Sequence, residues 1–140
     1  MPTIRLADRA LLTVEGPDAE HFLQNILTLD LDQLAPGVAM PGALLTPQGK
    51  VLFDFLISRT PGGFRIDCRA EIADEFLRRL MLYRLRAKVQ IGKADQPVVS
   101  AAWEIDSSTS HFDSGALRTE TPDFRDGRFP DDSGVMRIYG

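Results

Sequence analysis

Apolar residues recur with a period of about 3.6 in two segments of the chain, which predicts two amphipathic helices. The first is expected over 16–28, about three turns long, with Gly16 and Pro17 at its start. The second is expected over 71–86, where acidic residues come early and arginines late, as the helix dipole favours. The apolar stripes are Ala19, Phe22, Leu23, Ile26 and Leu27 in the first helix, and Ile72, Phe76, Leu80 and Tyr83 in the second.

Runs rich in apolar and β-branched residues between these helices predict strands. One is expected over 10–16 and a hairpin over 38–59, whose TPQG turn at 46–49 suits a type I turn. A second turn at 60–63 leads back through a strand at 64–69. Further strands are expected at 87–92, 97–105 and 135–140.

The element order β-α-β-β-β-α-β-β predicts an α+β fold, with an antiparallel sheet and two main helices on one face. We expect residues 1–105 to form the core of a single N-terminal domain. Residues 106–140 are polar and turn-rich until the last strand, with one short strand expected among long loops. They are predicted to be an extension of the same domain.

Composition narrows the class of protein. The chain has 140 residues and a net charge of −4, which fits one soluble domain and argues against direct nucleic-acid binding through charge alone. Its single cysteine, Cys68, excludes an internal disulfide and a cysteine metal cluster. No apolar run reaches the roughly 18 residues of a membrane span, and no signal peptide is evident. A reducing cytoplasmic location without a membrane partner is therefore expected.

Asp54 is the residue whose position in the sequence most needs a chemical explanation. It stands in a strand whose two faces are both apolar, so a buried carboxylate is expected there, and a buried charge needs a partner. One interpretation is a cross-strand ion pair with Arg69, which a two-residue loop at 61–62 would place opposite. The other is a carboxylate held in a dry site for a ligand. The pattern of residues alone leaves both open, because strand register is uncertain.

The remaining candidates have plainer interpretations. His21 is expected at the surface or boundary of the first helix, and Cys68 is expected to be a buried, unreactive thiol. The GALLTPQGKV segment at 42–51 lacks the spacing of a phosphate-binding loop. The basic end of the second helix is either a solvated face or a docking surface for an anion such as a polyglutamate tail or RNA phosphates.

Several motifs in order carry a resemblance to a known family. V-E-G-P-D-A-x-x-F-L-Q at 14–24 precedes Leu27-Thr28 and Asp30, a Pro-Gly connector and G-x-x-x-x-D ending at Asp54. Over residues 6 to 92 the chain resembles the start of the tetrahydrofolate-binding family of glycine cleavage T-proteins (aminomethyltransferases, GcvT-like) and YgfZ-type proteins. The YRLRAKVQI segment at 83–91 is more similar to the YgfZ type.

The resemblance implies the first folate-binding domain of the T-protein-like fold, with tetrahydrofolate or a one-carbon derivative as cofactor. Asp54 matches the second acid of a Gly-Gly-x-x-Asp-Asp stretch, a catalytic acid near the folate, whereas Phe53 replaces the first acid and Lys50 the second glycine. Thr28-Leu29-Asp30 stands for the family's Thr-Asn-Asp, and Pro41 for a pterin-site tyrosine. The folate wall is expected to comprise Asp54, Arg9, Thr28, Leu44, Leu45 and Thr46.

These departures favour the YgfZ branch, which is tied to iron–sulphur cluster assembly or repair and to tRNA modification. Its hallmark K-G-C-Y-x-G-Q-E segment is not in this sequence. We therefore expect an N-terminal portion that lacks the second half of the family architecture. Its interface to that half would be exposed or would support self-association.

Three functions follow as alternatives. The favoured one is a non-enzymatic, folate-binding accessory protein whose partners are iron–sulphur enzymes or assembly proteins. The second is a tetrahydrofolate-dependent aminomethyl- or methyltransferase in which Asp54 acts on a reacting nitrogen. The third is an interaction module without a ligand, in which Asp54 pairs with Arg69.

Overall fold

A computed structural model describes residues 3–95, 99–103, 123–129 and 134–139 of the chain. Their strands form one sheet of nine in the order β1-β7-β9-β8-β3-β4-β5-β2-β6. The strands are β1 (Thr3–Arg5), β2 (Arg9–Glu15), β3 (Val38–Leu45), β4 (Val51–Thr60), β5 (Gly63–Arg69), β6 (Gln90–Lys93), β7 (Val99–Ala102), β8 (Asp123–Asp126) and β9 (Met136–Tyr139). Neighbouring strands are antiparallel, except that β3 and β8 run parallel.

Two helices, α1 (Ala19–Ile26) and α2 (Ala70–Arg84), and the short 3₁₀ helix η1 (Leu31–Gln33) complete the described elements. Strands β2, β4 and β5 turn alternate side chains toward the helices, as the pleat requires. The core that results contains Leu12, Val14, Phe22, Leu23, Phe53, Phe55, Ile57, Phe64, Ile66, Phe76 and Leu80. Both helices therefore cover the same face of this part of the sheet.

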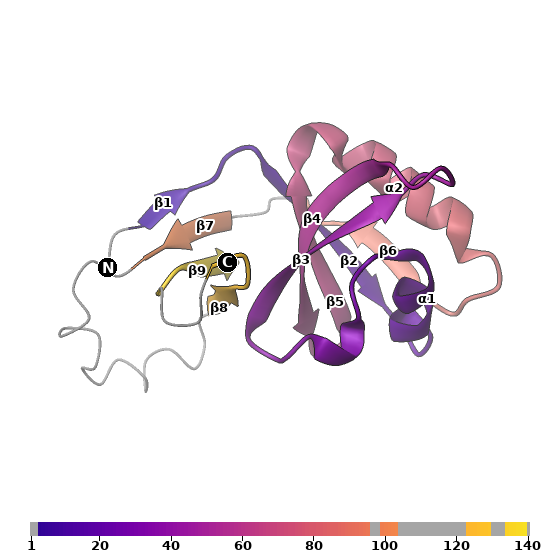
Figure 1. The fold of residues 1–140 in the computed structure, drawn as a ribbon, viewed down its shortest axis with the longest axis horizontal. Coiled ribbons are helices and arrows are strands. Elements are labelled where there is room, and N and C mark those ends of the chain that lie inside the picture. The colour runs from indigo at the N-terminus through magenta and orange to yellow at the C-terminus, as the bar shows by residue number, and fades with distance from the viewer. Residues whose placement is uncertain (1–2, 96–98, 104–122, 130–133, 140) are drawn as a thin grey trace.

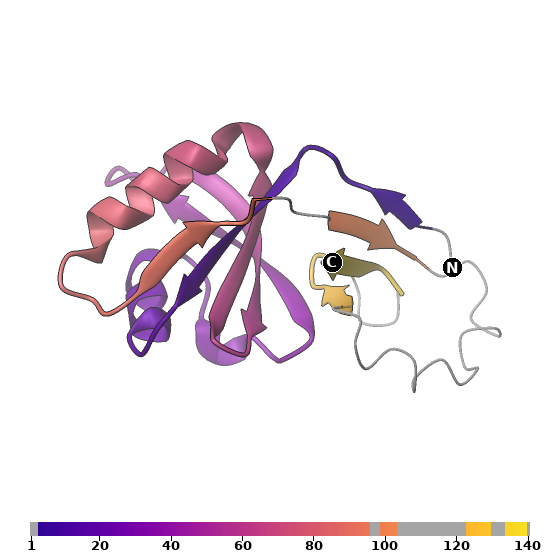
Figure 2. The ribbon, with the colours of Figure 1, turned by 180° about the vertical axis from the view of Figure 1, so that it is seen from behind.

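The strands β1, β7, β9 and β8 form the other part of the sheet, and the two views in Figures 1 and 2 both place it beside the helix-bearing part. Leu11 of β2, Val99 of β7 and Tyr139 of β9 make a second, smaller core. Leu11 lies on the strand face opposite Leu12, which packs toward the helices. The β7–β9 part therefore lies against the face that the helices leave open.

The predicted α+β class is confirmed, as are the hairpin of β3 and β4 and the second helix. Gly49 has φ +88° and donates its N–H to the carbonyl of Thr46, which closes the expected turn. The sheet is mixed because one pair is parallel, and β1 was not anticipated.

The first helix is shorter than predicted. It ends at Ile26 because the backbone of Leu27 is extended and forms a bridge with Leu44 of β3. Thr28 also pairs with β3, since its N–H donates to the carbonyl of Ala43. Tertiary pairing with β3 thus overrides the helical period at Leu27, the last residue of the stripe.

Candidate functional site

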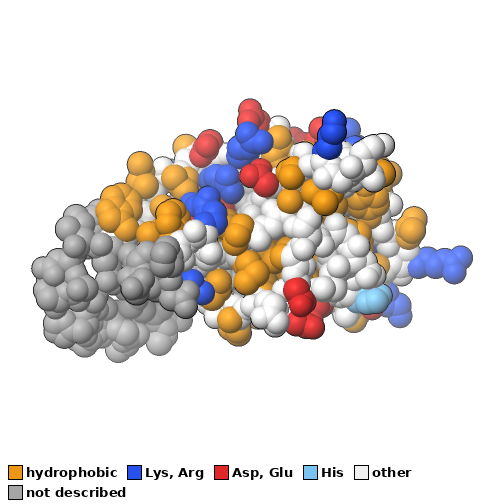
Figure 3. Space-filling model, viewed as in Figure 1, with side chains coloured by type: hydrophobic (Ala, Val, Ile, Leu, Met, Phe, Trp, Pro, Cys, Tyr) orange, Lys and Arg blue, Asp and Glu red, His pale blue; other side chains and the backbone are white. Residues whose placement is uncertain are grey.

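A hollow of about 330 Å³ opens on the sheet face away from the helices, between the two parts of the sheet. It is lined by Arg9, Pro41, Gly42, Asp54, Phe55, Leu56, Arg69 and Arg128. These residues come from β2, β3, β4, the end of β5 and the turn after β8. The space-filling view in Figure 3 shows basic and acidic side chains side by side over the middle of the molecule, where the two parts meet.

Asp54 lies in this hollow, but it is exposed, so the predicted burial of its carboxylate is wrong. The neighbouring Phe53 is buried and stacks on Phe76, with ring centroids 4.8 Å apart. Position 53 therefore faces the core and position 54 faces the hollow. An acid at 53, as the family pattern has, would point away from the hollow at this backbone geometry.

The ion pair predicted between Asp54 and Arg69 is not formed among the described residues. The register is as expected, since Leu56 pairs with Asp67 and the same spacing puts position 54 opposite 69. However, β5 ends at Arg69, where α2 begins, and the Arg69 guanidinium instead contacts Glu71 at 3.4 Å. Both side chains line the hollow without neutralising each other.

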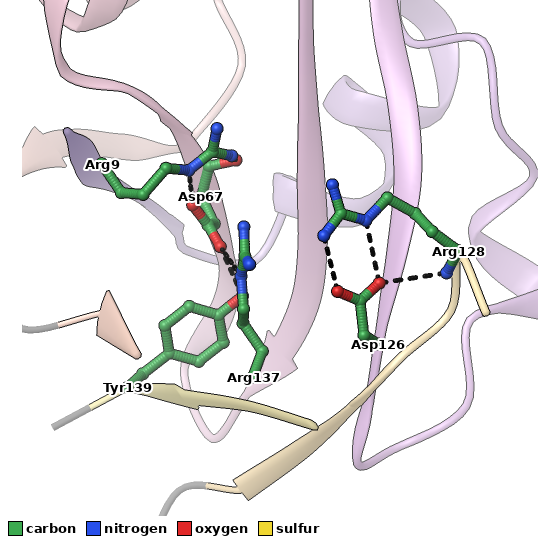
Figure 4. A network of polar contacts seen from close by, with 6 residues as sticks. All are labelled: Arg9, Asp67, Asp126, Arg128, Arg137 and Tyr139. Atoms are coloured by element: carbon green, nitrogen blue, oxygen red, sulfur yellow. Dashed lines mark hydrogen bonds and ion pairs between the residues drawn. The ribbon is translucent and has the colours of Figure 1, made fainter. Parts of the chain in front are cut away.

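Arg9, the second predicted site residue in the hollow, is held by a buried acid that the sequence analysis missed. Its Nε donates to Oδ1 of Asp67 at 2.6 Å and its Nη2 to the Asp67 carbonyl at 2.8 Å. The other oxygen of Asp67 accepts from Nε of Arg137 at 2.8 Å and from the hydroxyl of Tyr139 at 3.0 Å. Figure 4 shows how this cluster joins β2, β5 and β9.

The environment of Asp67 fixes the protonation of Tyr139. Burial raises the pKa of the Tyr139 phenol, and the neighbouring negative charge of Asp67 raises the pKa further. The phenol therefore stays protonated at neutral pH and can donate its hydrogen bond. Asp67 itself is fully buried, so each of its donors compensates for lost hydration.

Arg128 is fixed in the same manner from the opposite side of the hollow. Its Nε donates to Oδ1 of Asp126 at 3.0 Å and its Nη2 to Oδ2 at 2.7 Å, a bidentate pair drawn in Figure 4. Burial alone would raise the pKa of Asp126, but hydrogen bonds from Arg128 outweigh it and lower that pKa. The same contact raises the pKa of Arg128. The pair is therefore ionised at neutral pH.

The other predicted wall residues do not line the hollow. Thr28 is exposed, and its Oγ1 accepts from the N–H of Ala43 at 3.1 Å. Leu44 is buried in the core, Leu45 is half-buried at the end of β3, and Oγ1 of Thr46 accepts from the N–H of Lys50 in the turn. Their part in ligand binding remains a prediction.

No group of three or more His, Cys, Asp or Glu side chains is arranged to hold a metal ion in the described part of the chain. His21 is exposed on α1, near Asn25, as the sequence predicted, whereas His111 lies outside the described residues. Within the same residues, no helix has the length and hydropathy needed to cross a membrane.

Cys68 is fully buried on the helix-facing side of β5, which confirms the predicted environment. Burial raises the pKa of its thiol to about 11 from an ordinary 9.0, so at pH 8 it ionises about a hundredfold less than an ordinary thiol. We expect a disulfide reagent to modify the native protein far more slowly at pH 8 than the protein unfolded in urea. Equal rates in an absorbance assay would contradict this.

Comparison with known proteins indicates the class of protein to which the chain belongs. No family model matches it. The crystal structure of the glycine cleavage system aminomethyltransferase T from Bartonella henselae matches 71% of the chain and 27% of its own length, with a TM-score of 0.64 and 24% identity. That likeness shows the fold: the α+β architecture of a T-protein-like aminomethyltransferase domain.

Sequence relatives narrow the class. The chain is 34% identical over 131 residues to an iron-sulfur cluster assembly factor IBA57 homolog, mitochondrial, from Pyricularia oryzae, covering 89% of the chain and 32% of that relative. It is 33% identical over 94 residues to the tRNA-modifying protein YgfZ of Klebsiella pneumoniae, covering 67% and 29%. The chain belongs to the GcvT-like folate-binding family, with IBA57 and YgfZ as its relatives. It spans about a third of their length.

Proposed function

We propose that this protein is a tetrahydrofolate-binding accessory factor for iron–sulphur cluster assembly or repair, linked to tRNA modification. The observation that carries the proposal is the hollow, where an accessible carboxylate, three arginines and an apolar wall meet. The roles named for the IBA57 and YgfZ relatives support the cluster-assembly part of the proposal. The folate part is inferred from the family.

Asp54 is the ligand-facing acceptor in this proposal. Its carboxylate is exposed in the hollow and can accept a hydrogen bond from an N–H group of folate. Gly42, whose backbone also lines the hollow, is needed for packing on the opposite face, because a Cβ there would lie 2.6 Å from Cδ2 of Leu29 and 3.0 Å from the Phe55 ring in the core. Pro41 and Leu56 supply apolar surface beside it.

The domain and its partners form the rest of the proposal. Residues 1–105 and 106–140 would act together as the first folate-binding domain of a larger family architecture, since β8 and β9 belong to the same sheet as β3. Iron–sulphur enzymes or assembly proteins are the proposed partners, and self-association could complete the site. The protein would work in a reducing compartment such as the cytoplasm, where the free thiol of Cys68 is stable.

Tetrahydrofolate-dependent aminomethyl or methyl transfer is the second candidate. The fold likeness to an aminomethyltransferase and the accessibility of Asp54 favour it, since a general acid or base must reach its substrate. Turnover of a one-carbon donor would support it over the accessory role. The interaction-module alternative rested on an Asp54–Arg69 ion pair, which the described residues do not form.

The test is an anaerobic titration of the chain with tetrahydrofolate, in which calorimetry measures the affinity. We expect Asp54→Asn to weaken binding at least tenfold, about 1.4 kcal/mol, because the amide is a weaker acceptor than a carboxylate. Asp95→Asn is the matched control, since Asp95 is an exposed acid outside the hollow. Absence of any binding by the unsubstituted chain would refute the folate proposal, and an unchanged affinity in Asp54→Asn would remove Asp54 from the site.

A further inference from the structure

We propose that the C-terminal end of α2 is a docking surface for an acidic amphipathic helix of another protein. The surface, the α2 patch, is made of exposed side chains: Arg78, Met81, Leu82, Leu85, Arg86 and Lys88. Figures 1 and 2 both show this end of α2 at the opposite end of the molecule from β7 and β9. The inference goes beyond the proposed function and does not depend on folate binding in the hollow.

Three large apolar side chains of the α2 patch face solvent. Met81 is 43% exposed, Leu82 is 64% exposed and Leu85, at the C-cap, is 86% exposed. With Arg78 they fall at i, i+3, i+4 and i+7, so they form one stripe along the side of the helix that the sheet leaves uncovered. The stripe is about 10 Å long at a rise of about 1.5 Å per residue, which gives a second helix two turns to pack against.

The backbone of Leu85 is a second sign that this stripe has a partner. Its φ of +45° and ψ of −112° are those of the first central residue of a type II′ turn, which the hydrogen bond from the N–H of Ala87 to the carbonyl of Arg84 closes. Glycine is the residue that favours this conformation. A leucine there has an unfavourable backbone and an apolar side chain in water, so the fold of this domain alone does not account for it. A partner that covers the side chain does.

The charges around the stripe are positive and are not neutralised by neighbouring acids. Asp and Glu are absent from positions 76 to 94, whereas the same segment holds Arg78, Arg79, Arg84, Arg86 and Lys88. Within the part of the chain that the structure describes, none of these five side chains makes an ion pair or a hydrogen bond. Asp18 contacts the segment, but it accepts from the backbone N–H of Lys88 at 2.8 Å. Since the whole chain has a net charge of −4, the patch reverses the sign locally and favours an acidic partner.

The aliphatic stripe favours a protein helix over RNA as that partner. Surfaces that bind RNA combine cations with exposed aromatic rings on which bases stack. Here the exposed side chains between the cations are methionine and leucine, and Tyr83 is half-buried. A helix with leucines on one face and acids beside them can cover the stripe and pair with Arg78 and Arg86 at the same time.

The first half of α2 limits where the partner lies. Its exposed side chains include Glu71, Asp74 and Glu75, which lie on the same side of the helix as the stripe. These acids would repel an acidic helix, so the partner is confined to the last two turns of α2. They would also repel an anionic membrane that lay along the whole helix.

The test is an NMR titration of the intact, isotope-labelled chain with a synthetic peptide of about 15 residues that has leucines on one helical face and glutamates on the others. A scrambled peptide of the same composition is the control for amphipathicity, and oligouridylate is the control for RNA. We expect the amphipathic peptide to shift the amide signals of residues 78–88 and to bind about fivefold more tightly than the scrambled one. The signals of residues that line the hollow should not move.

Substitutions in the patch identify the side chains responsible. Leu82→Ala and Arg86→Gln should each weaken binding of the amphipathic peptide about threefold. Ile4→Ala and Arg5→Gln are the matched controls and should leave it unchanged, because both residues are exposed on β1, at the other end of the molecule.

Leu85→Gly separates docking from stability. Glycine suits the backbone at this position, so urea unfolding should show a protein at least as stable as the unsubstituted chain. The loss of the side chain should nevertheless weaken peptide binding about threefold. A variant that is destabilised and binds the peptide normally would show that Leu85 serves the fold and not a partner.

Each remaining outcome decides for or against the docking surface. Binding of oligouridylate without binding of the peptide would replace the protein partner with RNA. Equal binding of the two peptides would reduce the patch to a non-specific basic face, and no binding by any probe would leave a solvated face. All three would overturn the inference. Each would leave the folate proposal untouched, since the tetrahydrofolate titration reports on the hollow.

Discussion

Asp67→Asn is expected to lower the free energy of unfolding by about 3–5 kcal/mol, the range for removing one partner of a buried ion pair. Asp67 is fully buried, and its two oxygens accept from Arg9, Arg137 and Tyr139. The Arg137 side chain is only 5% exposed, so the substitution leaves a buried cation without its counter-charge. Urea unfolding followed by circular dichroism measures the effect.

Asp74→Asn is the control for this prediction. Asp74 pairs with Lys93 at 2.9 Å, but both side chains are exposed, and such pairs contribute about 0–1 kcal/mol. A loss in Asp67→Asn no larger than that in Asp74→Asn would show that the buried cluster contributes nothing to holding β9 against β5. Because Arg9 is positioned by Asp67, the same substitution should also weaken ligand binding in the hollow.

The sequence predicted this part of the molecule incompletely because the partners of Asp67 lie far away along the chain. Arg9 is 58 residues from Asp67 and Tyr139 is 72 residues from it. No periodicity within β5 reports that β9 will lie across its open face. One signal was available: Phe64, Ile66 and Cys68 alternate with Arg65 and Asp67, so the second face of β5 had to bury charge or meet solvent.

Asp54 illustrates the opposite error. The run of apolar residues around it suggested a strand covered on both faces, but β4 is longer than its partner β5, whose pairing with β4 reaches only Leu56. Val51 at the start of β4 is 64% exposed, which shows that this end lies beyond the covered part. A pattern of side chains gives the period of a strand but not where its neighbours stop.

The arginines that line the hollow show that local sequence pattern also predicts a site incompletely. Arg9 was named from the family resemblance, whereas Arg69 was considered only as an ion-pair partner and Arg128 not at all. Arg128 reaches the hollow because β8 pairs with β3 in parallel, through Val38 with Arg125 and Ala39 with Asp126. A parallel pairing between strands so far apart in sequence is the kind of contact that local pattern cannot predict.

The local pattern of apolar residues did predict the buried stripe of α2. Phe76→Ala tests how much of the free energy of unfolding depends on that stripe. Phe76 is fully buried and lies between Phe53 and Phe55 of β4, with ring centroids at 4.8 and 5.5 Å. Removing a buried phenyl ring costs its transfer free energy and leaves a cavity, so a loss of about 3–5 kcal/mol is expected in urea unfolding.

Leu82→Ala on the same helix is the control, since Leu82 is 64% exposed and should change stability by at most about 0.5 kcal/mol. Phe76 and the hollow lie on opposite faces of β4, because Phe53 stacks on Phe76 whereas the next residue, Asp54, faces the hollow. Phe76→Ala should therefore leave the tetrahydrofolate affinity of the remaining folded protein nearly unchanged. A stability loss under about 1 kcal/mol would mean that the stacked rings do not anchor α2 to the sheet.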